Sequence, residues 1–74
     1  MQNYHVTPTD TGWQLIKEGA SRPARRAQTK KEMLTLMQEF MEGKKASVKI
    51  HLQDGSIQEE RTYPRRADPA STPG

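Results

Sequence analysis

The sequence contains no cysteine, which excludes disulfides, thiolate metal ligands and a cysteine nucleophile. Aromatic residues are also scarce, with one Trp, one Phe and two Tyr in 74 residues, and only 31% of the residues are hydrophobic. No apolar run approaches the length of a membrane span, and the N-terminus lacks the basic-then-apolar pattern of a signal peptide. We therefore expect a soluble, cytoplasmic protein with one domain and a thin core.

What the sequence does contain is one clearly amphipathic segment, residues 29–43. At the helical period its hydrophobic residues share one face, which comprises Met33, Leu34, Leu36, Met37, Phe40 and Met41. Thr29 followed three residues later by Glu32 is a capping box, and it predicts where the helix begins. Gly43 can adopt the left-handed conformation that ends a helix. Because so short a helix is only marginally stable alone, its apolar face must pack against other elements.

Two segments before the helix alternate between hydrophobic and polar residues, as strands do. Residues 3–7 and 13–17 are separated by a turn-forming stretch and should form an antiparallel hairpin. In the second of them, Ile16 points away from Trp13 and Leu15, so both faces carry a hydrophobic residue. This pattern is typical of a central strand, and Ile16 needs cover from the C-terminal tail or from a second copy of the chain.

A second hairpin follows the helix. Residues 46–52 and 57–63 alternate in the same way and flank Asp54-Gly55, the strongest short hairpin signal in a sequence. A two-residue loop there places Leu52 opposite Ile57 and Lys49 opposite Glu60. It also places Glu59 and Arg61 on the face of Val48 and Ile50, which is typical of an edge strand that discourages further pairing.

These elements predict an α+β fold, with a small antiparallel sheet made of two hairpins and a single helix across one face. The chain order is β-β-(β)-α-β-β, where residues 24–28 are a candidate for a fifth, short strand. We expect one domain over residues 1–63 and a disordered tail over the proline-rich residues 64–74. The predicted core consists of Tyr4, Val6, Trp13, Leu15, Met33, Leu34, Met37, Phe40, Met41, Val48, Ile50 and Leu52, with Leu36 and Ile57 at its edge.

Several of these residues also resemble a known family. The matching stretches are His5-Val6-x-Pro8, Gly12-Trp13-x-Leu15, Thr29-Lys30-x-Glu32, Ile50-His51 and, most specific, the run from Asp54-Gly55 through Ile57-Gln58-Glu59-Glu60-Arg61-Thr62-Tyr63. Over residues 3–63 the chain resembles the small bacterial proteins called domain of unknown function 2188. The resemblance implies a compact α+β unit, and it implies no catalytic or binding residue, because no activity is established for that family.

No arrangement of residues predicts an enzyme or a cofactor site. His5 and His51 are the only histidines, and the sequence offers no third and fourth ligand at a spacing typical of a metal site. Glu59 and Glu60 are adjacent on a strand, so they point to opposite faces and cannot work as a paired acid and base. We therefore expect no enzymatic activity, no metal, no cofactor and no small-molecule substrate.

The one feature that suggests a function is a basic segment between residues 17 and 31. The whole chain has a formal net charge of +3, and this segment contains one acid, Glu18, and six basic residues. The six basic residues are Lys17, Arg22, Arg25, Arg26, Lys30 and Lys31. Such a segment can contact phosphates, so the first hypothesis is a non-catalytic module that binds nucleic acid. The alternative is a protein-interaction or self-associating module, suggested by the thin core and by Ile16.

Overall fold

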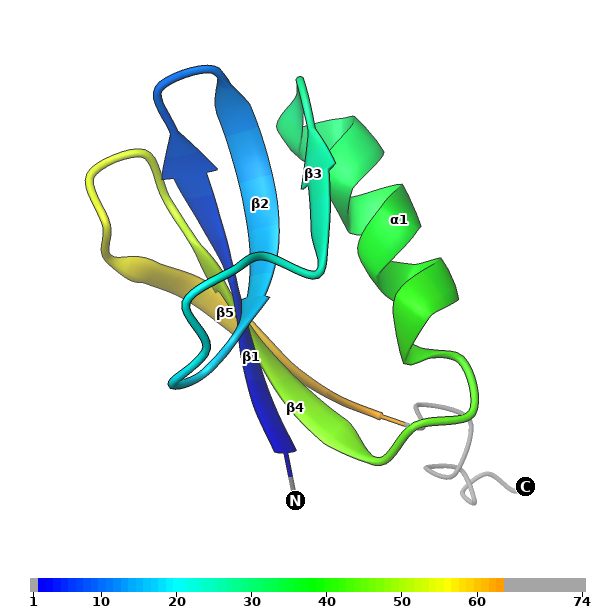
Figure 1. The fold of residues 1–74 in the computed structure, drawn as a ribbon. Coiled ribbons are helices and arrows are strands. Elements are labelled where there is room, and N and C mark those ends of the chain that lie inside the picture. Colours follow the sequence, from blue (N-terminus) through cyan, green and yellow to red (C-terminus); the bar gives the residue numbers. More distant parts are fainter. Residues whose placement is uncertain (1, 64–74) are drawn as a thin grey trace.

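A computed structural model of the chain describes residues 2–63. It contains five strands and one helix in the order β1, β2, β3, α1, β4, β5 (Figure 1). The elements are β1 (Gln2–Thr9), β2 (Gly12–Lys17), β3 (Arg25–Ala27), α1 (Lys30–Met41), β4 (Ala46–His51) and β5 (Ile57–Tyr63). The third strand is therefore present, and the α+β class expected from the sequence is confirmed. The predicted tail, residues 64–74, lies outside the described residues.

All five strands form one sheet with the spatial order β3-β2-β1-β4-β5. Both predicted hairpins are present, because β1 pairs antiparallel with β2 and β4 pairs antiparallel with β5. The expectation of an entirely antiparallel sheet was wrong, however, since β1 and β4 lie side by side in parallel, with Val6 opposite Ile50. A parallel neighbour needs a crossover connection, and β2, β3 and α1 together supply it.

The helix begins and ends close to where the sequence predicts. Thr29 is the N-cap, and its hydroxyl accepts a hydrogen bond from the Glu32 amide at 3.1 Å. The Glu32 carboxylate accepts from the amide of Gln28 rather than from that of Thr29, one residue earlier than in a standard capping box. Gly43, with a φ of 80°, provides the left-handed residue after the last turn.

The helix covers one face of the sheet and lies beside β3, β2 and β1 (Figure 1). Eleven hydrophobic residues are buried there. Nine of them were predicted, namely Tyr4, Val6, Trp13, Leu15, Met33, Met37, Met41, Val48 and Ile50, and the two that were not predicted are Ala46 and Tyr63. Leu34, Leu36 and Phe40 are partly buried against this cluster. Tyr63, at the end of β5, donates a hydrogen bond from its hydroxyl to the Met37 sulfur at 3.2 Å, and this contact ties β5 to the helix.

Two hydrophobic residues of the second hairpin lie outside the core, contrary to the prediction. Leu52 is 40% exposed and Ile57 is 54% exposed. The register is as predicted at Lys49–Glu60, but it shifts beyond Ile50, so that Ile57 pairs with His51 instead of Leu52. The Leu52 amide donates to the Ser56 carbonyl, which makes the turn longer than two residues and places Leu52 outside the strands. Among the described residues, no helix is long and apolar enough to cross a membrane.

Candidate functional site

The structure contains two candidate sites. One is the basic segment at the β3 edge of the sheet, and the other consists of the polar side chains on the sheet face opposite the helix. The strand alternation decides which side chains belong to each face. Arg25 is opposite Leu15, whose side chain faces the helix, and Arg26 is opposite Gln14 on the other face. The two adjacent arginines therefore point to opposite faces, as a strand at this position predicts.

Three of the six predicted basic residues line one groove, although the side chains of Arg25 and Arg26 leave β3 on opposite faces. An open groove of about 620 Å³ runs along the loop before β3 and along β3 itself. Its lining comprises Ser21, Arg22, Pro23, Ala24, Arg25 and Arg26. Because β3 is an edge strand with only β2 beside it, this groove lies at the rim of the sheet and is open to solvent.

Arg25 and Lys30 are held by other side chains of the domain. The Arg25 guanidinium lies 4.9 Å from the centre of the Phe40 ring, and its Nη1 donates to the Ala24 carbonyl at 2.7 Å. The Lys30 ammonium lies 5.2 Å from the centre of the Trp13 ring and also donates to the side chain of Gln58. Cation–π contacts of this kind stabilise the position of the cation without neutralising its charge.

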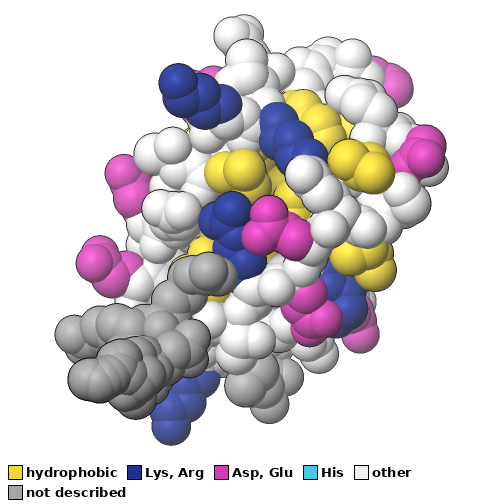
Figure 2. Space-filling model, turned by 180° about the vertical axis from the view of Figure 1, so that it is seen from behind, with side chains coloured by type: hydrophobic (Ala, Val, Ile, Leu, Met, Phe, Trp, Pro, Cys, Tyr) yellow, Lys and Arg dark blue, Asp and Glu magenta, His cyan; other side chains and the backbone are white. Residues whose placement is uncertain are grey.

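The remaining predicted basic residues, Lys17 and Lys31, are exposed and lie outside the groove. Lys17 ends β2 opposite Tyr4, and Lys31 belongs to the first turn of α1. Figure 2, which shows the molecule from behind, displays its Lys and Arg side chains singly, separated by acidic, hydrophobic and uncharged residues. Of the six cations, only Arg22, Arg25 and Arg26 line the groove, and they are the compact part of the set.

None of these six cations forms an ion pair with an acidic side chain of the described residues. The three ion pairs found between residues 2 and 63 join His5 to Glu18, Lys49 to Glu60 and Arg61 to Glu59. Glu18, the one acid within the basic segment, is directed to His5 on the other side of the sheet from the helix. The arginines of the groove consequently form no ion pair within this part of the chain.

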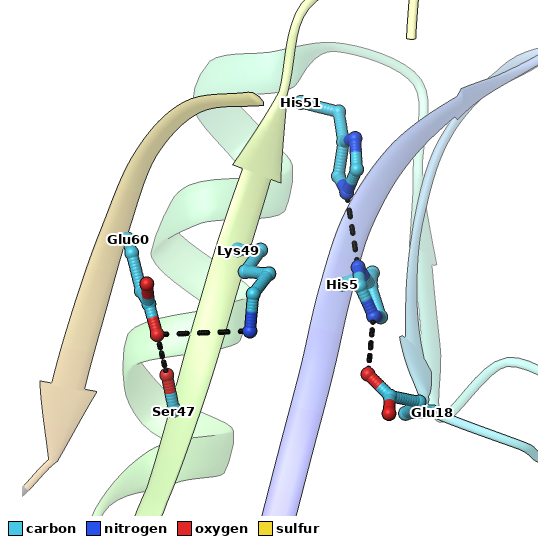
Figure 3. A network of polar contacts seen from close by, with 6 residues as sticks. All are labelled: His5, Glu18, Ser47, Lys49, His51 and Glu60. Carbon is cyan, nitrogen blue, oxygen red and sulfur yellow. Dashed lines mark hydrogen bonds and ion pairs between the residues drawn. The ribbon is translucent and has the colours of Figure 1, made fainter. Parts of the chain in front are cut away.

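The open face of the sheet carries a chain of hydrogen bonds that the sequence did not predict (Figure 3). His5 Nε2 and the Glu18 carboxylate are 3.0 Å apart, and His5 Nδ1 is 2.9 Å from His51 Nε2. His51 Nδ1 is in turn 2.9 Å from the Gly55 carbonyl in the β4–β5 turn. Strand alternation puts His5 and His51 on the face opposite the helix, but only the parallel pairing of β1 with β4 makes them neighbours.

A second polar cluster lies next to this chain (Figure 3). The Glu60 carboxylate accepts a hydrogen bond from the buried Ser47 hydroxyl at 2.6 Å and is 3.6 Å from the Lys49 ammonium. The Ser47 hydrogen bond, followed by the charge of Lys49, lowers the pKa of Glu60 below its ordinary value of 4.5. On β5, the hydrogen bond from Arg61 to Glu59 at 2.9 Å raises the pKa of Arg61.

Within residues 2–63, no three His, Asp or Glu side chains are grouped so as to hold a metal ion. No paired carboxylates, and no serine with a histidine and a carboxylate, are found among the contacts of the described side chains. The geometry is that of a small scaffold with an open cationic groove at one edge and a polar hydrogen-bonded face.

Comparison with known proteins places the chain in a family. The model of a family described as an uncharacterized protein conserved in bacteria, DUF2188, matches residues 4–63. The chain belongs to this family. The match covers the helix and the strands except for the first two residues of β1, so the fold described above is the DUF2188 unit of this chain. No curated protein and no solved structure matches the chain.

Proposed function

We propose that this DUF2188 protein is a non-catalytic module that binds the phosphate backbone of nucleic acid through the groove at β3. The observation that carries the proposal is the grouping of Arg22, Arg25 and Arg26 around one open groove, with no acidic partner among residues 2–63. A guanidinium presents a planar set of donors that matches a phosphate, and it retains its charge at any relevant pH.

The geometry narrows the surface that the sequence suggested. Arg22 and Arg26 are the strongest candidates for phosphate contacts, because both are exposed and neither stacks on a ring within the described structure. Arg25 contributes charge from a fixed position above Phe40. The N-terminus of α1 adds little, because the Thr29 hydroxyl already occupies its Glu32 amide and the Glu32 carboxylate places negative charge there.

The test is a titration with short duplex and single-stranded DNA and RNA at low salt, followed by NMR. Binding at the groove should shift the amide signals of residues 21–26, with Pro23 giving none. The affinity should fall steeply with salt, because each phosphate contact releases counterions. If the signals of this segment do not move with any of the four ligands at low salt, the proposal is wrong.

A matched set of charge variants distinguishes phosphate contacts at the groove from general attraction between nucleic acid and a basic protein. Arg22→Gln and Arg26→Gln should each reduce the slope of log affinity against log salt by about 1. Lys45→Gln removes the same charge from an exposed position outside the groove, so it should leave that slope unchanged. Equal effects of all three variants would show non-specific attraction of a basic protein and would contradict a contact at the groove.

A second candidate function is protein interaction or self-association. Its support is the exposure of Leu52 and Ile57, which flank the β4–β5 turn, because large exposed hydrophobic residues occur at interaction sites. Ile16, which suggested this function in the sequence, is half-buried and supports it less. Sedimentation velocity at two concentrations, on the wild type and on Ile57→Ser, tests self-association. A strict monomer in both proteins would remove self-association.

A further inference from the structure

From the open face of the sheet we infer a second site, and we propose that His5 and His51 together bind one divalent transition-metal ion. This site is independent of the groove at β3. From the sequence we expected no metal, because no third and fourth ligand accompanies the two histidines at a spacing typical of a metal site. The proposal rests on the hydrogen-bond partners that the fold supplies to each of the four ring nitrogens.

The two histidine rings face each other across a gap between His5 Nδ1 and His51 Nε2. The other nitrogen of each ring, which faces away from this gap, has a hydrogen-bond acceptor beside it. His5 Nε2 faces the Glu18 carboxylate at 3.0 Å, and His51 Nδ1 faces the Gly55 carbonyl at 2.9 Å. A carboxylate and a carbonyl can only accept hydrogen bonds, so these two nitrogens must be the donors. We therefore assign the ring hydrogen of His5 to Nε2 and that of His51 to Nδ1. His5 Nδ1 and His51 Nε2 are then left with lone pairs that face each other across 2.9 Å.

Two lone pairs at this separation repel each other, so either a proton, which gives the ring-to-ring hydrogen bond described above, or a metal ion must lie between them. For metal–nitrogen bonds of about 2.0–2.1 Å, two nitrogens on neighbouring corners of a square plane are about 2.9 Å apart, and on a tetrahedron roughly 3.3 Å. The observed spacing of 2.9 Å matches the square-planar geometry that Cu²⁺ and Ni²⁺ prefer. Rotations of the rings about their outer torsions, which are soft, would direct both lone pairs at one ion.

The surroundings of the pair resemble those of established metal ligands. A ligating histidine commonly donates its other N–H to a carboxylate or a backbone carbonyl, and Glu18 and Gly55 fill these two roles here. The His5 side chain is 24% exposed, so an ion can reach the gap from solvent and keep water at its open positions. Lys49 is opposite His5 in the sheet, but its ammonium is directed to Glu60 at 3.6 Å.

The test is a calorimetric titration of the tag-free protein with Cu²⁺, Ni²⁺ and Zn²⁺ salts, because a histidine tag would bind the same ions. One Cu²⁺ should bind per chain, more tightly than Ni²⁺ or Zn²⁺. The ring nitrogen signals of both histidines should shift in NMR spectra when Zn²⁺ is added. If those signals respond to pH and to none of the metals, the gap holds only a proton and the proposal is overturned.

Variants locate the site. His5→Gln and His51→Gln should each abolish the one-to-one binding, with folding checked by circular dichroism. Glu18→Gln retains both rings and should weaken binding by about 10–100-fold, as removal of a supporting carboxylate does. Glu39→Gln removes an acid from the exposed surface of α1 and should change nothing. Binding that survives both histidine variants, or an unchanged affinity in Glu18→Gln, would overturn the proposal.

Discussion

The two faces of the sheet are organised by different interactions. On the face beside α1, Val6, Leu15, Val48 and Ile50 are fully buried, and packing against the helix holds them. On the opposite face the same strands present His5, Lys49 and His51, which are half-buried. The two histidines are hydrogen-bonded to each other, and Lys49 forms an ion pair with Glu60. Strand alternation produces both surfaces from the same strands, since neighbouring residues point to opposite sides.

This difference shows how a chain with so few hydrophobic residues forms five strands. One helix can cover only part of one face, and β5, farthest from it in the sheet order, carries Glu59 and Arg61 on the covered side. The other face needs no second layer, because its polar side chains satisfy one another and remain in contact with water. Antiparallel sheets commonly have one solvated face, and here a sheet with one parallel pair does as well.

The largest expected effect is a loss of stability at the covered face. Ile50→Ala removes a side chain with 0% exposure and should lower the free energy of unfolding by about 2–5 kcal/mol. Ile16→Ala makes the same change at a half-buried position on the open face, opposite His5, and should lower it by about 1 kcal/mol. Urea unfolding followed by Trp13 fluorescence measures both. Equal losses would show that the open face is packed as tightly as the covered one.

A smaller effect is expected where β3 joins the sheet. A Cβ at Gly12 would lie 2.3 Å from the Ala27 carbonyl oxygen and 2.9 Å from the Gln28 Cα, and both are backbone atoms that cannot turn aside. Gly12→Ala should therefore push β3 outward and lower the free energy of unfolding by about 1–3 kcal/mol. NMR should show the amides of residues 25–27 shifting, whereas those of β4 remain in place.

Gly55→Ala is the matched control for that substitution. Gly55 also has a positive φ, of 93°, but no atom lies within 4 Å of the added Cβ. This variant should show only the backbone strain, about 1 kcal/mol, and no movement of β3. If Gly12→Ala is no more destabilising than Gly55→Ala and its β3 signals are unchanged, close contact does not hold β3 against β2.

The local parts of this fold could be predicted from the sequence. Thr29, Glu32 and Gly43 mark the ends of α1 through interactions within a few residues, and Asp54-Gly55 marks the second hairpin in the same way. The separation of Arg25 from Arg26 followed from strand alternation alone. In each case the residues that decide the structure are close together in the chain.

The parallel pairing of β1 with β4 could not be predicted, and the open face depends on it. Alternation places Val6 and Ile50 on the buried side of any sheet, but it does not say which strands are neighbours. His5 and His51, which are 46 residues apart, meet only because of this pairing. The retention of Lys30 by Trp13 and Gln58 likewise joins elements that are distant in the chain.

The smallest expected effect is a dependence of stability on pH at the open face. Because the pKa of Glu60 is lowered in the folded state, chiefly by the Ser47 hydrogen bond, its ionised form stabilises the fold above pH 4.5. That contribution is lost as the pH falls through the lowered pKa. Urea midpoints at pH 7, 4.5 and 3 should therefore decline less in Ser47→Ala than in the wild type.

Thr62→Ala alters the residue opposite Ser47 and should retain the wild-type decline. An unchanged decline in Ser47→Ala would mean that Glu60 does not contribute, leaving packing on the covered face as the source of stability.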